Sequence, residues 1–166
     1  MIFVTVGTQY GFDRFIEAID EWAGRCPQLN LFAQIGLGKY QPRNMEFQDF
    51  IDPTEFKIRL KSSDCIFAHA GMGSILLALE NGKPIIVMPR DPELGEHQNS
   101  HQIATASRFK ETGQIQVAMN EKELTPLLDA YADAPNRKKI GHEASSGLIK
   151  AIRNSINDLR YGSNLV

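Results

Sequence analysis

The sequence predicts an α/β protein with a doubly wound, mostly parallel six-stranded sheet, built as a single domain over residues 1–166. Apolar runs of about five residues alternate with segments of helical period, which is typical of βα units around a parallel sheet. The 166 residues suit one domain, and 42% hydrophobic with 23% charged residues are ordinary globular values. This composition excludes a disordered or fibrous protein.

We expect four strands in the first half of the chain, with helices between them. The strands are residues 2–6, 29–35, 45–51 and 65–68, each an apolar run bounded by turn residues. A helix is predicted over residues 12–23, because apolar side chains recur on one face: Phe15, Ile16, Ile19 and Trp22. Another helix begins at Asp52-Pro53, since proline suits the first helical turn.

The second half continues the alternation. A helix from Ser74 to Asn81 is followed by strands at 84–89 and 115–119, with a helix over 96–110 between them. A helix over 121–131 and a polar loop over 132–139 come next. The last helix is predicted over about 141–160, with one apolar stripe. This stripe packs either against its own sheet or against a partner, and both interpretations stay open.

Composition also excludes some classes of function. The net charge is −2, from 18 Lys and Arg against 20 Asp and Glu, and no basic run is present, so we expect no nucleic-acid partner. Cys26 and Cys65 lie too far apart for a disulfide framework and favour a reducing compartment. The first apolar run is too short for a signal peptide or a membrane span, so we expect a cytoplasmic location.

Two strand ends carry glycine-rich turns, where open α/β sheets bind their ligands. Gly7-Thr8-Gln9 follows the first strand, and HAGMGS, from His69 to Ser74, follows the fourth. Glycines directly before a helix leave its first amides open, and the helix dipole adds partial positive charge, so this turn predicts a diphosphate site. No Lys follows the second glycine, which argues against a metal-assisted NTPase. The alternative is that these glycines serve only turn geometry and close packing.

The loop at residues 90–102 is rich in hydrogen-bonding side chains, which suits the hydroxyls of a sugar. His97 and His101 have the spacing of two metal ligands on a helix, but a third ligand is missing, so we expect no metal. The alternative is a solvated helix start in which Glu96 favours the dipole. The sequence contains neither a GxSxG nucleophile motif nor an evident pair of catalytic carboxylates.

Three ordered segments, VTVGTQ, HAGMGS with LENGKPIIVMPR, and GEHQNSHQ, resemble the C-terminal, donor-binding domain of glycosyltransferase family 28 over roughly residues 1–119. Within that family, the chain is similar to the soluble subunits of two-component UDP-N-acetylglucosamine transferases, of the dolichol pathway and of bacterial exopolysaccharide operons. The resemblance implies a Rossmann-like GT-B C-terminal half. It also implies sugar transfer from a UDP-sugar with inversion, without a metal or other cofactor.

The resemblance also suggests residue roles. It assigns the diphosphate to Gly7, Thr8, Gln9, Gly71, Gly73 and Ser74, with His69 as a possible catalytic residue. It assigns uracil to the backbone of Phe50 and Ile51, and the donor sugar to Glu96, His97, Gln98 and Asn99. Where many relatives have a ribose-binding glutamate, this chain has Leu77. Our hypothesis is that Glu80, one helical turn later, contacts the ribose, and the alternative is a solvated Glu80 paired with Lys83.

A GT-B enzyme closes two domains around its substrates, and this chain supplies one of them. The resemblance therefore implies the catalytic donor subunit of a hexosyltransferase in polysaccharide or exopolysaccharide synthesis. Its partner would be a membrane-associated subunit that binds a polyprenol-linked acceptor, supplies the base and holds the chain at the inner face of the membrane.

Two alternatives remain, a non-catalytic enhancer or regulatory subunit and an unrelated flavodoxin-like enzyme that binds a flavin or another phosphate ligand. The sequence does not identify the sugar. A glucuronate would need a cation, for which Arg90 is the candidate.

Overall fold

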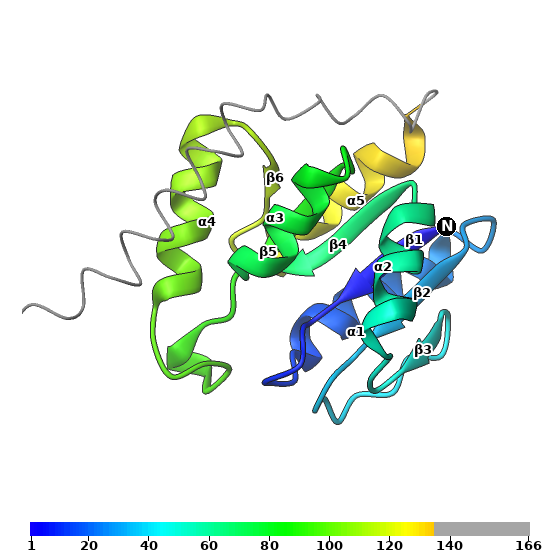
Figure 1. Ribbon diagram of the computed structural model, residues 1–166, viewed down its shortest axis with the longest axis horizontal. Coiled ribbons are helices and arrows are strands. Elements are labelled where there is room, and N and C mark those ends of the chain that lie inside the picture. Colours follow the sequence, from blue (N-terminus) through cyan, green and yellow to red (C-terminus); the bar gives the residue numbers. More distant parts are fainter. Residues whose placement is uncertain (135–166) are drawn as a thin grey trace, which may run out of the picture.

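The computed structural model describes residues 1–134, so the helix predicted over 141–160 lies outside the described residues. Six strands form one parallel sheet in the order β3-β2-β1-β4-β5-β6 (Figure 1). They are β1 (Ile2–Thr5), β2 (Leu31–Gln34), β3 (Glu46–Gln48), β4 (Cys65–His69), β5 (Ile85–Met88) and β6 (Gln116–Val117). The chain winds outward in both directions from β1 and β4, which confirms the doubly wound prediction.

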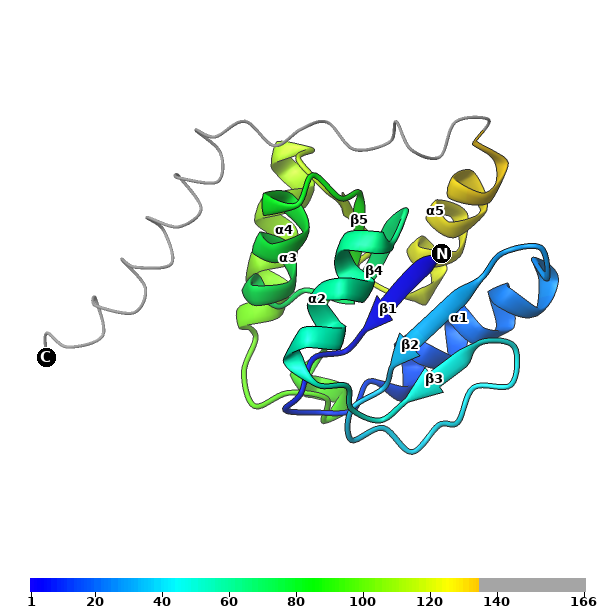
Figure 2. The same ribbon diagram turned by 45° about the vertical axis from the view of Figure 1, so that its right-hand side comes forward.

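Helices cover both faces of the sheet, as Figures 1 and 2 show. On one face lie α1 (Asp13–Arg25) and α5 (Glu121–Asp133), and on the other lie α2 (Pro53–Ser62), α3 (Met72–Glu80) and α4 (His101–Thr112). A short 3-10 helix, η1 (Pro92–Leu94), follows β5. Within residues 1–134, no helix combines the length and the apolar character that a bilayer crossing requires.

The four strands β1, β2, β4 and β5 each contribute to two hydrophobic layers, because alternate side chains point to opposite faces of the sheet. Val4 and Phe67 pack toward α1 and α5, while Phe3 and Ile66 pack toward α2, α3 and α4. Burial on both faces explains why the central strands are continuous apolar runs rather than alternating ones.

Two helix starts differ from the sequence prediction. The helix expected from residue 96 begins only at His101, with Ser100 as its N-cap, and residues 96–100 form a turn after the left-handed Gly95 (φ 71°) that ends η1. The helix expected from Ser74 begins at Met72, with Gly71 as its N-cap. Gly73 therefore lies inside the first turn of α3. The start of α2 agrees with the prediction, and Asp52 caps it by accepting from the amides of Thr54 and Glu55 at 2.8 and 3.0 Å.

Candidate functional site

An open cleft of about 440 Å³ lies at the carboxyl ends of β1 and β4, where the strand order reverses. This is the position at which doubly wound sheets bind ligands. The lining comes from the β1–α1 loop, the end of β2, the start of α2 and the β4–α3 turn. The lining residues are Val6, Gly7, Thr8, Gln9, Gln34, Ile51, Pro53, Phe56, Lys57, His69, Gly73, Ser74 and Leu77.

Most of the residues predicted to bind the diphosphate meet in this cleft, although they come from distant parts of the sequence. The structure brings together Gly7, Thr8, Gln9, His69, Gly73 and Ser74, with the predicted uracil residue Ile51 beside them. Sequence reasoning missed Gln34, Phe56 and Lys57. A polar residue at the end of the apolar strand LFAQ was a usable signal for Gln34, whereas Phe56 and Lys57 look like ordinary residues of a surface helix.

The first turn of α3 offers main-chain amides to the cleft. No side chain caps α3, and the amide of Ile75 donates to the Gly71 carbonyl at 3.2 Å, so the amides of Met72, Gly73 and Ser74 precede the helix's own ladder. Because Gly73 and Ser74 line the cleft, this positive helix end faces it. The Gly71 amide instead donates to the His69 carbonyl at 2.8 Å, and Gly71 does not line the cleft, which argues against its predicted diphosphate contact.

The His69 ring lies between two glycines. A Cβ on Gly7 would lie 2.9 Å from His69 Cε1, and a Cβ on Gly71 would lie 2.8 Å from His69 Cδ2. Gly7 also has a φ of 76°, which disfavours any side chain. Close packing on one ring therefore favours glycine at both Gly7 and Gly71, as the packing alternative expects, while Gly7 also lines the cleft.

His69 is neutral in this environment. Burial lowers its pKa to about 3, and the nearby charge of Arg90 acts in the same direction. Its Nδ1 is buried and has no hydrogen-bond partner among the described residues. A general base is most effective with a pKa near the working pH, so this environment argues against the possible catalytic role of His69.

The side of the cleft formed by α2 and α3 is largely apolar, with Ile51, Phe56 and Leu77 in its lining. Among the lining residues of the described chain, Lys57 carries the one side chain that is charged at neutral pH. The two other residues assigned to uracil and ribose do not line the cleft: Phe50 is 47% exposed, and Glu80 lies at the end of α3. The structure therefore does not bring Glu80 to the place where Leu77 lies.

Glu96, predicted to bind the donor sugar, has a structural role instead. Its carboxylate accepts two hydrogen bonds from the Arg14 guanidinium, each 2.8 Å long, and one from the Asp91 amide at 2.8 Å. Arg14 also pairs with Glu121 at 2.7 Å, and these partners raise the pKa of Arg14. Both oxygens of Glu96 are thus used to fasten the β5–α4 loop to α1, which argues against the predicted contact of Glu96 with a sugar.

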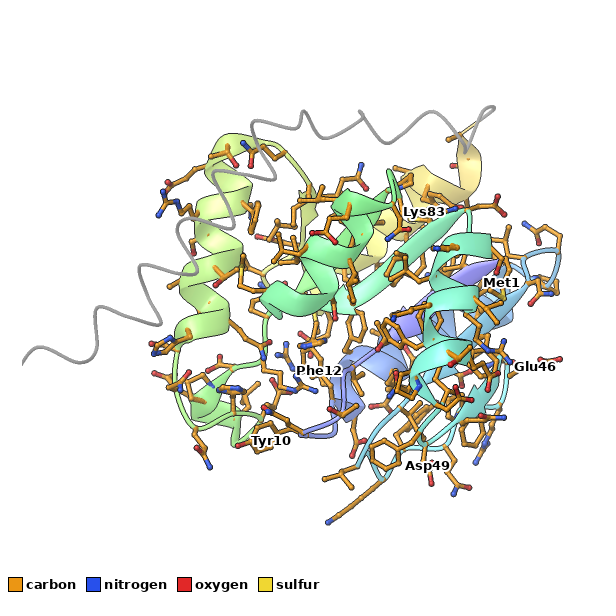
Figure 3. All side chains as sticks on the ribbon, viewed as in Figure 1. Met1, Tyr10, Phe12, Glu46, Asp49 and Lys83 are labelled. Atoms are coloured by element: carbon orange, nitrogen blue, oxygen red, sulfur yellow. The ribbon has the colours of Figure 1, made fainter. Side chains whose placement is uncertain are left out.

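The other predicted sugar-binding residues, His97, Gln98 and Asn99, lie in the turn before α4 and outside the cleft lining. The ring of His97 contacts that of Tyr10 with centroids 5.2 Å apart, so this turn adjoins the β1–α1 loop. Figure 3 shows Tyr10 at the end of the molecule opposite Lys83. The contact of His97, Gln98 and Asn99 with a sugar stays a prediction. Within residues 1–134, no three His, Cys, Asp or Glu side chains form a group suited to a metal.

Arg90 is not available to a glucuronate, because its side chain is directed into the protein. The residue is 2% exposed, and its guanidinium donates to the carbonyls of Val6, Tyr10 and Gly11 at 2.6, 2.7 and 3.1 Å. Burial lowers the pKa of Arg90 to about 10, so the group remains positively charged at neutral pH. This corrects the suggestion that Arg90 recognises the donor sugar.

Comparison with protein families gives a match to the glycosyltransferase family 28 C-terminal domain over residues 1–155. UDP-N-acetylglucosamine transferase subunit ALG13 of Mus musculus is 31% identical over 125 residues, which cover 68% of this chain and 10% of that protein. The Homo sapiens protein of the same name is 32% identical over 124 residues, with 69% and 10% covered. The chain thus spans about a tenth of the length of these relatives.

Solved structures share the fold. A glycotransferase of kitacinnamycin superposes with a TM-score of 0.61 at 23% identity, over 96% of this chain and 42% of that one. The NMR solution structure of ALG13 gives 0.61 at 23% identity, over 95% and 93%. UDP-GlcNAc 2-epimerase from Neisseria meningitidis, bound to UDP-GlcNAc, gives 0.61 at 14% identity, over 96% and 43%. These likenesses confirm the predicted Rossmann-like GT-B half.

Proposed function

Since the chain belongs to the glycosyltransferase family 28 C-terminal domain family, we propose that it is the donor-binding catalytic subunit of a two-component inverting glycosyltransferase. The donor in this proposal is a UDP-sugar and the acceptor is a polyprenol-linked saccharide in polysaccharide or exopolysaccharide synthesis. The similarity to proteins named UDP-N-acetylglucosamine transferase subunit supports this donor class.

The single observation that carries the proposal is the composition of the cleft. The uncapped start of α3 supplies amides at Gly73 and Ser74, and the α2 side supplies apolar surface at Ile51 and Phe56. A nucleoside diphosphate binds where these two surfaces lie side by side, because the amides contact its anionic diphosphate and the apolar surface contacts its flat base. The volume of about 440 Å³ suits a ligand of nucleotide size.

The proposed chemistry places the reacting bond beyond the diphosphate. The acceptor hydroxyl oxygen forms a bond to the anomeric carbon while the bond from that carbon to the β-phosphate oxygen breaks, and UDP leaves with the electron pair. Amides at the start of α3 would stabilise the negative charge that grows on the leaving diphosphate. The proton of the acceptor hydroxyl passes to a base on the partner subunit.

A partner is part of this proposal. His69 is a poor base, and the lining of the described cleft contains no carboxylate. We infer that a membrane-associated subunit supplies the base and the acceptor site, and that it holds this chain at the cytoplasmic side of a membrane. A purified chain that transfers sugar to a lipid-linked acceptor by itself would contradict this part.

The same missing base supports a second candidate, an enhancer or regulatory subunit that binds nucleotide weakly or not at all. The two candidates differ in nucleotide binding and in the effect of variants on turnover. In the catalytic proposal, damage to the cleft lowers turnover of the assembled enzyme. In the regulatory one, it leaves turnover unchanged.

Calorimetric titration tests the donor site. We expect affinity to rise from uridine to UMP to UDP, because each phosphate adds charge near the start of α3. ADP serves as the control for base preference. No UDP binding, with or without the partner, would favour the regulatory subunit. Glu80→Gln is expected to leave UDP affinity unchanged because Glu80 does not line the cleft, and a loss of affinity would restore the ribose hypothesis.

A further inference from the structure

Arg90 fixes the loop that carries Gly7, Thr8 and Gln9. Its Nη2 donates to the Val6 and Tyr10 carbonyls at 2.6 and 2.7 Å, and its Nε donates to the Gly11 carbonyl at 3.1 Å. These carbonyls lie on both sides of residues 7–9 in the chain. One guanidinium therefore links the two ends of the β1–α1 loop through hydrogen bonds to main-chain oxygens alone.

Arg90 is itself held from two further directions. Its amide donates to Gln102 Oε1 in the first turn of α4 at 3.1 Å, and its guanidinium carbon lies 5.2 Å from the centroid of the Phe12 ring. The planar guanidinium has several donors in a fixed fork, a geometry that an ammonium group does not reproduce. The position of the β1–α1 loop is thus set by β5 and α4.

The charge of Arg90 has no direct partner of opposite sign. Among residues 1–134, no carboxylate forms an ion pair with it. The charged and titratable groups that influence it or share its surroundings are Glu96, Tyr10, His69, His97 and Arg14, whose guanidinium carbon lies 5.4 Å from the centroid of the same Phe12 ring. Glu96 raises the pKa of Arg90 from a distance while its own oxygens bind Arg14 and Asp91. A cation contacted only by neutral carbonyls favours an anion nearby, because the effective dielectric constant is lower at a protein site than in water.

Resting on the proposed function, we propose that Arg90 is a positioning residue for the donor diphosphate. Its fork holds the main chain of residues 6–11 in the conformation that lines the cleft, and its unpaired charge favours a multiply charged ligand over a neutral one. Arg90 touches neither phosphate in this proposal. It acts through the β1–α1 loop and through its electric field.

The test compares three variants by titration with UDP and with uridine at several salt concentrations. Arg90→Met removes the fork and the charge, Arg90→Lys keeps the charge and loses the fork, and Arg59→Met is the matched control. Arg59 also stacks on a ring, that of Phe32, and pairs with Glu55, but it does not line the cleft. Its loss changes the net charge by the same amount as Arg90→Met.

We expect Arg90→Met to weaken UDP binding at least tenfold, to change uridine binding much less, and to flatten the dependence of UDP affinity on salt. Arg90→Lys is expected to weaken UDP binding while it keeps the wild-type salt dependence, and Arg59→Met to bind UDP as the wild type does. A general structural defect would weaken uridine and UDP binding alike and leave the salt dependence unchanged, which would overturn the proposal.

The proposal is also wrong if a folded Arg90→Met binds UDP with wild-type affinity and salt dependence. If Arg90→Met does not fold, Arg90→Lys decides. Wild-type UDP affinity in that variant, or an equal loss of UDP and uridine affinity, overturns the positioning role. A loss of UDP affinity with nearly unchanged uridine affinity supports it. Failure of the wild-type chain to bind UDP contradicts the proposed function itself. The two failures are therefore distinguishable.

Discussion

Gly73→Ala separates the folding role of the α3 start from its binding role. Gly73 lies in the first turn of α3, its φ is not positive, and an added Cβ would meet no atom within 4 Å. Alanine therefore fits without strain and reduces the conformational entropy of the unfolded chain. We expect the free energy of unfolding to rise by about 0.5–1 kcal/mol. For a chain of this size, that corresponds to a melting temperature roughly 1–4 °C higher.

UDP binding should change in the opposite direction. Gly73 lines the cleft, so the added methyl group occupies space next to the amides proposed to approach the diphosphate. The loss of one charge-assisted hydrogen bond costs about 1.5–3 kcal/mol, which is roughly a 10- to 150-fold larger dissociation constant. Thermal melting and calorimetry on the same preparation measure both effects. A variant that is more stable and still binds UDP at wild-type strength would refute the assignment of the diphosphate to this turn.

Three further predictions follow from contacts around the cleft. Gly71→Ala should lower the free energy of unfolding by about 1–3 kcal/mol, because the new Cβ overlaps the His69 ring. Urea denaturation should show a smaller loss when the same substitution is made in a His69→Ala variant. Equal losses in the two backgrounds would contradict the contact. The pKa of His69 is about 3 in the folded protein and about 6.5 in the unfolded chain. As the pH falls below about 6.5, the unfolded chain binds a proton that the folded protein does not, so the free energy of unfolding decreases. Between pH 7 and 5 this contribution is about 2 kcal/mol, and it should be missing in His69→Gln. Glu96→Gln should cost about 1–3 kcal/mol in a urea melt, because Glu96 is largely buried against Arg14, while Glu121→Gln, at a side chain 39% exposed, should cost less.

The fold was largely readable from the sequence because buried parallel strands leave a clear pattern. The run IIVM is apolar throughout and IFVT is apolar except for Thr5, and each is followed by a glycine or proline within a few residues. The start of α4 was predicted wrongly because the polar stretch from residue 96 to 100 continues smoothly into the helix. The N-cap of α4 is Ser100, and neither it nor its neighbours form a distinctive helix-start signal in the sequence.

The cleft was predictable only where its function depends on the main chain. Glycine-rich turns after β1 and β4 predicted the main-chain part of the cleft at Gly7 and Gly73. The sheet brings these two turns together where the strand order reverses. The partners of polar side chains were not predictable, because the sequence does not say whether such a side chain contacts a ligand or the protein itself. Glu96 and Arg90 illustrate this, since both looked suited to a sugar and both bind groups of this chain.

The three carbonyls held by Arg90 have a consequence for how such a protein diversifies. Arg90 binds only main-chain oxygens of this loop, so its hydrogen bonds do not depend on the side chains of Thr8, Gln9 and Tyr10. These three positions can therefore be substituted, which would change the ligand preference, while the main chain of the loop keeps its conformation. A library randomised at positions 8 to 10 with Arg90 retained is a natural starting point for engineering new donor selectivity.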